Sequence, residues 1–227
     1  MSTDTLKQPA APSSLRLVMT LAIAGLVSGV AIIGIYESTL PTITANKARE
    51  LREAVFKVLP GVSQMQAMVY RDGTLVVVEK PDKDEPVVYG GYDVAGEFMG
   101  YAIPAAGPGF QDTIGLLYGY TPDGKLVLGM EILESRETPG LGDKIYKDAD
   151  FVAGFSALSV EPEIVAVKKG TKSLANEIDA ITGATISSKA VVRIINETHA
   201  EWAQRLPPPG AEPGLAVTGS AGSGVEP

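Results

Sequence analysis

The chain has 227 residues, with 19 lysines and arginines against 27 aspartates and glutamates, and a net charge of −8. It has no cysteine and one histidine, which excludes disulfides and cysteine-ligated zinc or iron–sulfur centres, and no metal site is expected. The acidic balance argues against nucleic acid as a partner, because that interaction needs a basic face.

Apolar residues gather near the N-terminus, which explains a mean hydropathy of +0.14 in a charged chain. Residues 17–36 form a run of 20 without a charge, long enough to cross a bilayer as a helix. A cleaved signal peptide would have a shorter apolar region and a small-residue cleavage site, so we predict an uncleaved anchor. Lys7 and Arg16 precede the span, and the positive-inside rule then predicts a cytoplasmic segment over residues 1–16 and an extracytoplasmic remainder.

The C-terminal end is also distinct in composition. Residues 207–227 are rich in Pro, Gly, Ser and Ala, and such a segment cannot bury enough apolar surface to offset its ordering entropy. We therefore predict a disordered tail there and one folded domain over residues 37–206. Because residues 1–16 carry +1 and the tail carries −2, the folded domain carries −7.

The expected elements of that domain are helices at the ends and strands between them. A stalk helix is predicted over residues 46–59, where apolar positions recur at helical spacing before Pro60-Gly61. The clearest hairpin surrounds the turn Thr121-Pro122-Asp123-Gly124. Strands are expected over 68–70, 74–79, 87–89, 98–103, 114–119, 126–133 and 164–167, a short helix over 151–158, and a last helix over 187–206. This order is typical of an α+β domain with a mainly antiparallel sheet.

A Pro-Gly turn follows the hairpin, in the segment Glu137-Thr138-Pro139-Gly140-Leu141-Gly142. The Pro-Gly pair forces a turn and the second glycine allows a further reversal. The backbone of such a loop can press against a ligand, with the leucine as an apolar contact and the glutamate and threonine as polar ones. On spacing alone, an ordinary turn that ends a strand is the simpler explanation.

Hydroxyl side chains crowd the start of the last helix, in the segment Asp179-Ala180-Ile181-Thr182-Gly183-Ala184-Thr185-Ile186-Ser187-Ser188. Ser187 or Ser188 is expected to cap the helix. The free N–H groups and the positive end of the helix dipole would also suit an anion such as phosphate, with Lys189 adding charge. The segment has no P-loop frame and no GxGxxG unit follows a strand, so nucleotide hydrolysis and Rossmann-type binding are not expected.

These two segments, about 45 residues apart, together resemble the covalent-FMN domain found in the G subunit of the Rnf ion-translocating electron transport complex. The C subunit of the sodium-translocating NADH:quinone reductase shares that domain. The resemblance covers the N-terminal segment, the membrane span, the stalk helix, a Gly-rich hairpin that begins at Gly107-Pro108-Gly109, both motifs and the last helix. The chain length favours the Rnf type. In one departure, relatives often have a histidine where this chain has Ser135, so no role is carried over to that side chain.

The resemblance implies that FMN is attached by a phosphoester to Thr185, the last threonine of the Thr-Gly-Ala-Thr motif. It also implies a separate flavin transferase that uses FAD, since no histidine or cysteine lies near this threonine in the sequence. The loop around Leu141 would flank the flavin ring, and Glu137 and Thr138 would hydrogen-bond its edge. The implied cofactor-binding residues are Thr182, Gly183, Ala184, Thr185, Ser187, Ser188, Glu137, Thr138, Gly140 and Leu141.

The function implied by the resemblance is that of a membrane-anchored flavoprotein subunit. It would carry electrons through FMN within a complex that couples electron transfer between ferredoxin and NAD to ion translocation, and it would not be catalytic without its partner subunits. The expected location is the cytoplasmic membrane, with the FMN domain on the periplasmic side. Three alternatives stay open: a protein like the C subunit of the quinone reductase, a non-redox scaffold subunit that has kept the fold, and a free-standing anchored flavoprotein that serves another reductase.

Overall fold

The computed structural model describes residues 13–82 and 85–216. The chain forms two compact units, Met1–Arg49 and Glu50–Pro227. Residues 1–12 of the predicted cytoplasmic segment and residues 217–227 of the predicted tail lie outside the described residues.

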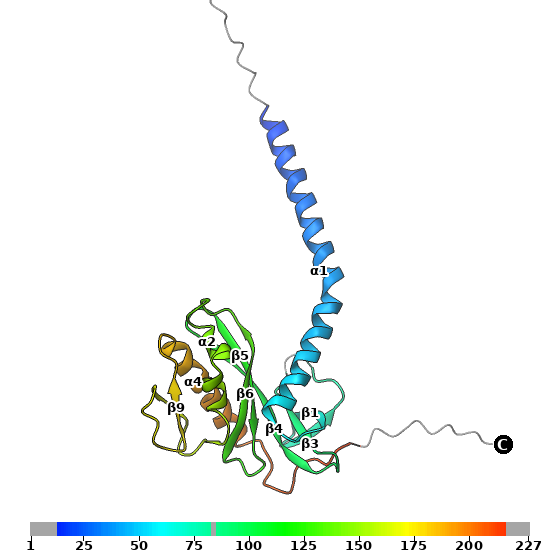
Figure 1. Ribbon diagram of the computed structural model, residues 1–227. Helices are drawn as coiled ribbons and strands as arrows, with labels where there is room; N and C mark the ends of the chain where they lie inside the picture. The colour runs from blue at the N-terminus through cyan, green and yellow to red at the C-terminus, as the bar shows by residue number, and fades with distance from the viewer. Residues whose placement is uncertain (1–12, 83–84, 217–227) are drawn as a thin grey trace, which may run out of the picture. The chain divides into compact units, whose positions relative to one another are not determined.

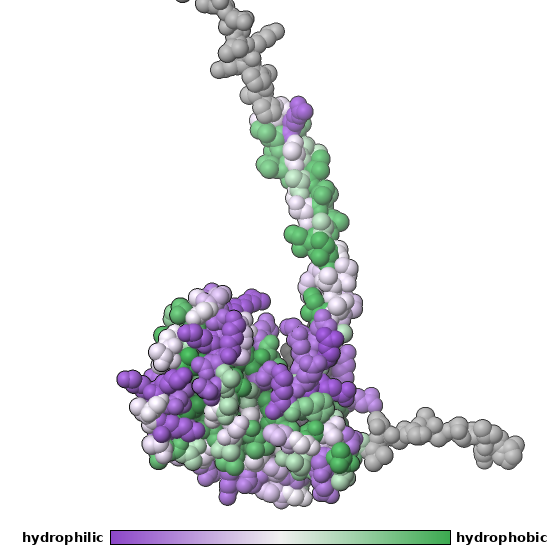
Figure 2. All heavy atoms as spheres, viewed as in Figure 1, coloured by the Kyte–Doolittle hydropathy of each residue, from purple (hydrophilic) through white to green (hydrophobic). Residues whose placement is uncertain are grey.

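One long helix, α1 (Ser14–Val58), contains the whole predicted span and most of the predicted stalk (Figure 1). The sequence predicts two helices, but Pro41 lies inside a single one. The hydroxyls of Ser38 and Thr39 donate hydrogen bonds to the carbonyl of Ile35, in the turn before the proline. Within the described residues, α1 alone is long and apolar enough to cross a membrane. Figure 2 shows apolar side chains covering this part of the helix.

A seven-stranded antiparallel sheet forms the body of the second unit, in the order β2-β1-β3-β4-β5-β6-β7. Gly73 and Gly124 adopt positive φ in the turns of two of its hairpins, where other residues would be strained. The sheet confirms the expected α+β architecture and each strand predicted within it. Its strands are β1 (Gln64–Arg71), β2 (Thr74–Val78), β3 (Val87–Tyr92), β4 (Phe98–Pro108), β5 (Thr113–Tyr120), β6 (Leu126–Ser135) and β7 (Leu158–Ser159).

The remaining elements are three helices and a parallel strand pair. The helices are α2 (Lys144–Lys147), α3 (Ala149–Ala153) and α4 (Thr185–Trp202), and the pair is β8 (Val165–Lys168) with β9 (Glu177–Ala180). The sequence pattern does not predict α2, β7 or β9. Elements of two to four residues are too short to show a helical or strand period.

Helical segments from the two ends of the second unit cover opposite faces of the sheet. On one face, Val191 and Ile195 of α4 join a core that includes Tyr118 of β5. On the other face, Val55 and Val58 of α1 pack with neighbours that include Leu117. Alternate side chains of β5 therefore enter different cores, as the strand period requires.

The last turn of α1 approaches the sheet closely at Gly119. A Cβ at this position would overlap the carbonyl oxygen of Val58. Glycine at this strand position is therefore what allows α1 to end against β5.

Residues 207–216, which composition assigns to a disordered tail, make hydrogen bonds to β1 and β3. The side chain of Gln66 donates to the carbonyl of Gly214 (3.0 Å) and accepts from the N–H of Ala216 (2.9 Å). The hydroxyl of Tyr92 donates to the carbonyl of Pro213. Composition could not show these contacts, because they are polar and their partners lie more than 100 residues earlier. The bounds of the predicted cytoplasmic segment, membrane span, folded domain and tail remain predictions.

Candidate functional site

Three segments of the second unit meet at the buried side chain of Glu137. Its Oε1 atom accepts hydrogen bonds from the backbone N–H groups of Phe110 (2.9 Å) and Gln111 (3.0 Å), in the turn between β4 and β5. Its Oε2 atom accepts from the hydroxyl of Ser187 (2.6 Å), in the first turn of α4. Only 5% of Glu137 is exposed, so one carboxylate fastens this turn and α4 to the 137–142 loop.

Glu137 is held in its charged form by these donors. Burial raises its pKa, but the hydrogen bonds from Ser187, Gln111 and Phe110 together outweigh burial and hold the pKa below its ordinary value. A carboxylate with three donors is therefore available at neutral pH to fix the loop.

The two glycines of the 137–142 loop have different roles. Gly140 has a φ of +78° and forms the expected turn after Pro139, where the N–H of Leu141 donates to the carbonyl of Thr138 (3.1 Å). Gly142 leaves room for the central contact, because a Cβ there would lie 2.5 Å from Glu137 Oε2 and 2.9 Å from Ser187 Oγ.

The expected helix cap is wrong. Helix α4 begins at Thr185, with Ala184 in the capping position and no capping side chain, so the predicted capping serines lie inside the first turn. Ser187 donates to Glu137 instead. Ser188 accepts from the N–H of Ile181 (3.1 Å) and donates to the carbonyl of Ala184 (2.9 Å). The hydroxyl of Ser188 thus holds the turn that precedes α4, and the hydroxyl of Ser187 ties α4 to the 137–142 loop.

A groove of about 350 Å³ lies between the 137–142 loop and the start of α4; we call it the flavin groove below, after the ligand that the sequence resemblance leads us to expect. Its rim carries three large apolar side chains, Phe110, Leu141 and Ile186, which are 64%, 52% and 60% exposed. Neighbouring exposed apolar side chains are typical of a binding surface. The structure thus joins the two motifs that stand out in the sequence. The groove is lined by Phe110, Thr138, Leu141, Gly142, Gly183, Ala184, Thr185, Ile186 and Ser187.

The structure places Glu137 and Ser188 behind this groove rather than in its lining. Glu137 is expected from the resemblance at the edge of a flavin ring, but its buried carboxylate oxygens receive donors from the protein itself. The sequence motifs do not include Phe110, and they predict no role for Ile186. Two features of the sequence could have indicated these residues. Phe110 is an aromatic residue next to Gly109 in a turn, and Ile186 lies away from the apolar face of the last helix.

Thr185 is the exposed first residue of α4. Its hydroxyl makes a long contact of 3.5 Å to the carbonyl of Ile181, and the backbone N–H groups of a first helical turn have no carbonyl partner within the helix. Thr185 and Gly183 line both the flavin groove and a second hollow of about 290 Å³. Thr182 lines only this second hollow. We call it the lysine hollow; its lining is Ala166, Val167, Lys168, Lys169, Ala180, Thr182, Gly183, Thr185 and Lys189.

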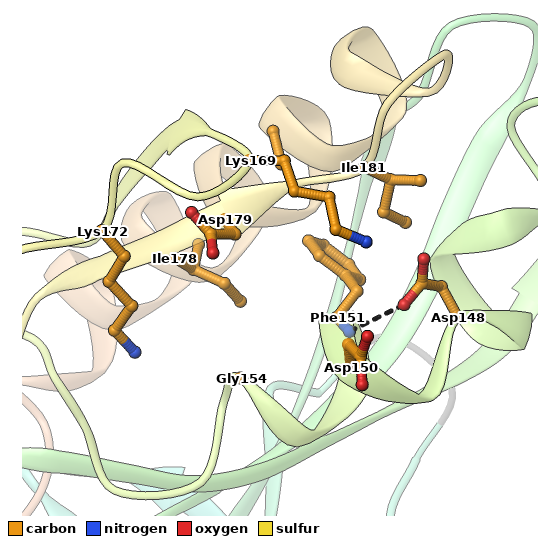
Figure 3. A pocket seen from close by; sticks show the side chains of 10 residues that line it. Asp148, Asp150, Phe151, Gly154, Lys169, Lys172, Ile178, Asp179 and Ile181 are labelled. Atoms are coloured by element: carbon orange, nitrogen blue, oxygen red, sulfur yellow. Dashed lines mark hydrogen bonds between the residues drawn. The ribbon is translucent and has the colours of Figure 1, made fainter.

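A third hollow, of about 320 Å³, is shown in Figure 3. Phe151 and Ile178 give it an apolar surface, and Asp148 accepts a hydrogen bond from the N–H of Phe151 (3.1 Å). Lys169 lines both this pocket and the lysine hollow. The pocket shares no lining residue with the flavin groove.

The part of the chain that the structure describes offers no ready site for a metal ion. Among those residues, no group of three or more histidine, aspartate or glutamate side chains is arranged to hold one.

Comparison with known proteins connects this part of the chain with FMN. Residues 109–199 match the family model described as the FMN-binding domain, a range that includes all three segments around Glu137. The chain is 36% identical over 149 residues to the G subunit of the Na(+)-translocating ferredoxin:NAD(+) oxidoreductase complex of Acetobacterium woodii, covering 62% of this chain and 68% of that protein. It is 30% identical over 179 residues to the G subunit of the ion-translocating oxidoreductase complex of Methanosarcina acetivorans, covering 78% and 88%.

Solved structures show the same fold. NqrC of Shewanella oneidensis superposes with a TM-score of 0.57 at 19% identity, covering 67% of this chain and 91% of that one. The C subunit of the Na(+)-translocating NADH-quinone reductase of Parabacteroides distasonis gives a TM-score of 0.51 at 23% identity, covering 64% and 78%.

Proposed function

The chain belongs to the family of G subunits of ion-translocating oxidoreductase complexes, and on this premise we propose that it carries electrons through FMN bound covalently to Thr185. The family, the FMN-binding domain and the apolar helix α1 make it a membrane-anchored FMN-binding subunit of a redox complex. The observation that carries the covalent proposal is the position of Thr185, exposed at the start of α4 on the border of an apolar groove and a basic hollow.

The size and the lining of the flavin groove support this proposal. Its volume of about 350 Å³ lies within the range of small-molecule pockets. Phe110, Leu141 and Ile186 offer apolar contacts that would flank the ring and exclude water from it. The hydroxyl of Thr138, which donates to the side chain of Gln111 (2.7 Å), lies where it could meet a polar ring edge. When bound, FMN supplies the redox chemistry, and the protein supplies position and electrostatics.

The other residues of the two motifs support the groove and keep Thr185 accessible. Gly183 and Ala184 leave Thr185 accessible, since neither has a side chain long enough to cover it. The carboxylate of Glu137 and the hydroxyls of Ser187 and Ser188 hold the two walls of the groove in place. A phosphodiester on Thr185 would keep one negative charge at the positive end of α4.

We attribute formation of the bond to a separate flavin transferase. The linings of the flavin groove and the lysine hollow contain no histidine and no carboxylate that could take the proton of Thr185. With FAD as donor, the threonine oxygen would replace adenosine monophosphate on the flavin-side phosphate, and the hydroxyl proton would be released. Thr182 lines only the lysine hollow, which makes it the natural control.

We further propose that the N-terminus is cytoplasmic and that the FMN domain lies on the periplasmic side, among the other subunits of the complex. The name of the Acetobacterium relative describes ferredoxin:NAD(+) oxidoreduction coupled to Na(+) translocation, and we extend the electron-transfer role, without the choice of ion, to this chain. A role like that of the quinone reductase C subunit is less well supported, because its solved structures share only the fold at 19% and 23% identity.

Denaturing gel electrophoresis under ultraviolet light tests the attachment. The full-length chain, produced in cells that contain the flavin transferase, should give a fluorescent band. Thr185→Ala should abolish the fluorescence and Thr182→Ala should retain it. A dark band from the unsubstituted chain would instead favour the non-redox scaffold.

A further inference from the structure

The lysine hollow concentrates positive charge in an acidic protein. Lys168, Lys169 and Lys189 line it together with Thr182 and Thr185. The chain as a whole has a net charge of −8, so a group of three lysines in one hollow is opposite in sign to the net charge of the protein.

These lysines have no carboxylate partner among residues 13–82 and 85–216. Other lysines of the domain do: Lys57 pairs with Glu131 and Lys147 with Asp143, each at 2.6 Å. Cations that share a concave surface without counter-ions repel one another. An anion in the hollow would relieve that repulsion.

The carboxylates of β9 bond to the backbone of the preceding loop. Asp179 accepts from the N–H of Gly170 (3.0 Å). Glu177 accepts from the N–H groups of Ser173 (2.7 Å) and Leu174 (3.0 Å). Both carboxylates fix the loop between β8 and β9, and Asp148 and Asp150 line the pocket of Figure 3 rather than the lysine hollow. Within the described residues, none of these carboxylates forms an ion pair with Lys168 or Lys189.

Strand register brings the lysines to Thr185. In the parallel pair of β8 and β9, Lys168 lies opposite Ala180, two residues before Thr182. Lys189 comes from α4, four residues and about one helical turn after Thr185. Two elements that are distant in sequence therefore place charge beside the same hydroxyl.

We propose that the lysine hollow binds the phosphate of a flavin nucleotide, so that the chain holds the nucleotide non-covalently before any bond to Thr185 forms. This inference rests on the proposed function, which places the flavin ring in the adjoining groove. Gly183 and Thr185 line both cavities, so a molecule with its ring in one and its phosphate in the other passes over Thr185. An ammonium group binds phosphate as a point charge, and flavins with one or two phosphates share this chemistry.

The residues to substitute are Lys168 and Lys189. Lys169 is less suitable because it also lines the pocket of Figure 3, where its side chain extends toward Phe151. A matched control removes two lysines that do not line the hollow: Lys80, just after β2, and Lys125, in the turn before β6.

The test uses the full-length Thr185→Val chain, purified in detergent from cells without the transferase, so that no covalent bond can form. Riboflavin, FMN and FAD are titrated at low salt, and binding is followed by flavin fluorescence. FMN should bind about tenfold more tightly than riboflavin, as expected for charge-assisted phosphate contacts. This preference should weaken at high salt.

Lys168→Gln/Lys189→Gln should abolish the preference for FMN and leave riboflavin affinity unchanged, whereas Lys80→Gln/Lys125→Gln should keep the preference. FAD bound more tightly than FMN would show that the hollow holds both phosphates, and equal affinities that it holds one. An FMN preference that survives loss of the hollow lysines, or that falls equally in the control, overturns the inference. Neither result contradicts the proposed binding of the flavin ring in the groove. Lysine-dependent FMN binding without riboflavin binding supports the hollow and contradicts the groove, and binding of neither flavin overturns both.

Discussion

The carboxylate of Glu137 accepts a 2.6 Å hydrogen bond from the hydroxyl of Ser187, 50 residues later in the chain. Both side chains are buried, with exposed fractions of 5% and 3%. One partner belongs to the loop that carries Leu141, and the other to the helical turn that carries Thr185. This bond therefore sets the spacing of the two walls between which we place the flavin.

Substituting Glu137→Gln should destabilise the domain. The amide cannot accept from all three donors as the carboxylate does, and hydrogen bonds to a buried charged group contribute about 1.5–3 kcal/mol each. We expect a loss of about 2 kcal/mol in the free energy of unfolding, measured by thermal or denaturant unfolding of the detergent-purified chain.

The matched control for this substitution is Glu197→Gln. Glu197 is 62% exposed and pairs with Arg193 one turn away on α4, and such surface pairs contribute little. Equal losses in the two variants would contradict the role of Glu137 as the tie between loop and helix.

The contribution of Glu137 should depend on pH. Because its folded-state pKa lies below the ordinary value of 4.5, its charged form stabilises the fold above that value, and this stabilisation is lost as the pH falls through the lower folded pKa. The stability difference between the unsubstituted chain and Glu137→Gln should thus be full at neutral pH and shrink in acid. A difference that stays constant or grows on acidification would contradict this prediction.

The two loop glycines should respond differently to alanine. Gly142→Ala places a Cβ against the Glu137–Ser187 contact, and overpacking of this kind costs about 1–3 kcal/mol. Gly140→Ala meets nothing within 4 Å and suffers only the strain of its positive φ, about 1 kcal/mol. Unfolding measurements and in-gel flavin fluorescence should both show the larger loss for Gly142→Ala, and the reverse order would be evidence against the assigned roles.

Exposed apolar side chains on the groove should matter for binding and little for stability. Leu141→Ser removes a side chain that is 52% exposed, so the melting temperature should change little. Riboflavin affinity should fall about tenfold, as expected when an apolar contact of this size is lost. Val94→Ser, at a position 86% exposed outside the groove, should change neither quantity; loss of affinity in both variants would contradict a specific ring contact.

The sequence predicts the fold class, the apolar anchor and both motif segments because each is encoded locally. Strand alternation, the Pro-Gly turn and the uncharged span need only neighbours along the chain. The two motifs do line one groove, with Thr138, Leu141 and Thr185 in it.

What the sequence could not show depends on contacts distant in the chain. A serine at the start of a helix can cap it or donate elsewhere, and the position of Glu137 decides this for Ser187. The register of β8 and β9 places Lys168 opposite Ala180, and Lys168 and Thr182 then line the same hollow. The sequence does not show which residues of two such short strands pair with one another. Pro41 signals a break locally, yet α1 continues through it.

The intact mass of the purified full-length chain tests the central claim most directly. In cells that contain the transferase, the mass should exceed the calculated value by one FMN less water, with Thr182→Ala showing the same increment and Thr185→Ala showing none. An unmodified mass for the unsubstituted chain, or an increment that survives Thr185→Ala, would contradict covalent attachment of FMN at Thr185.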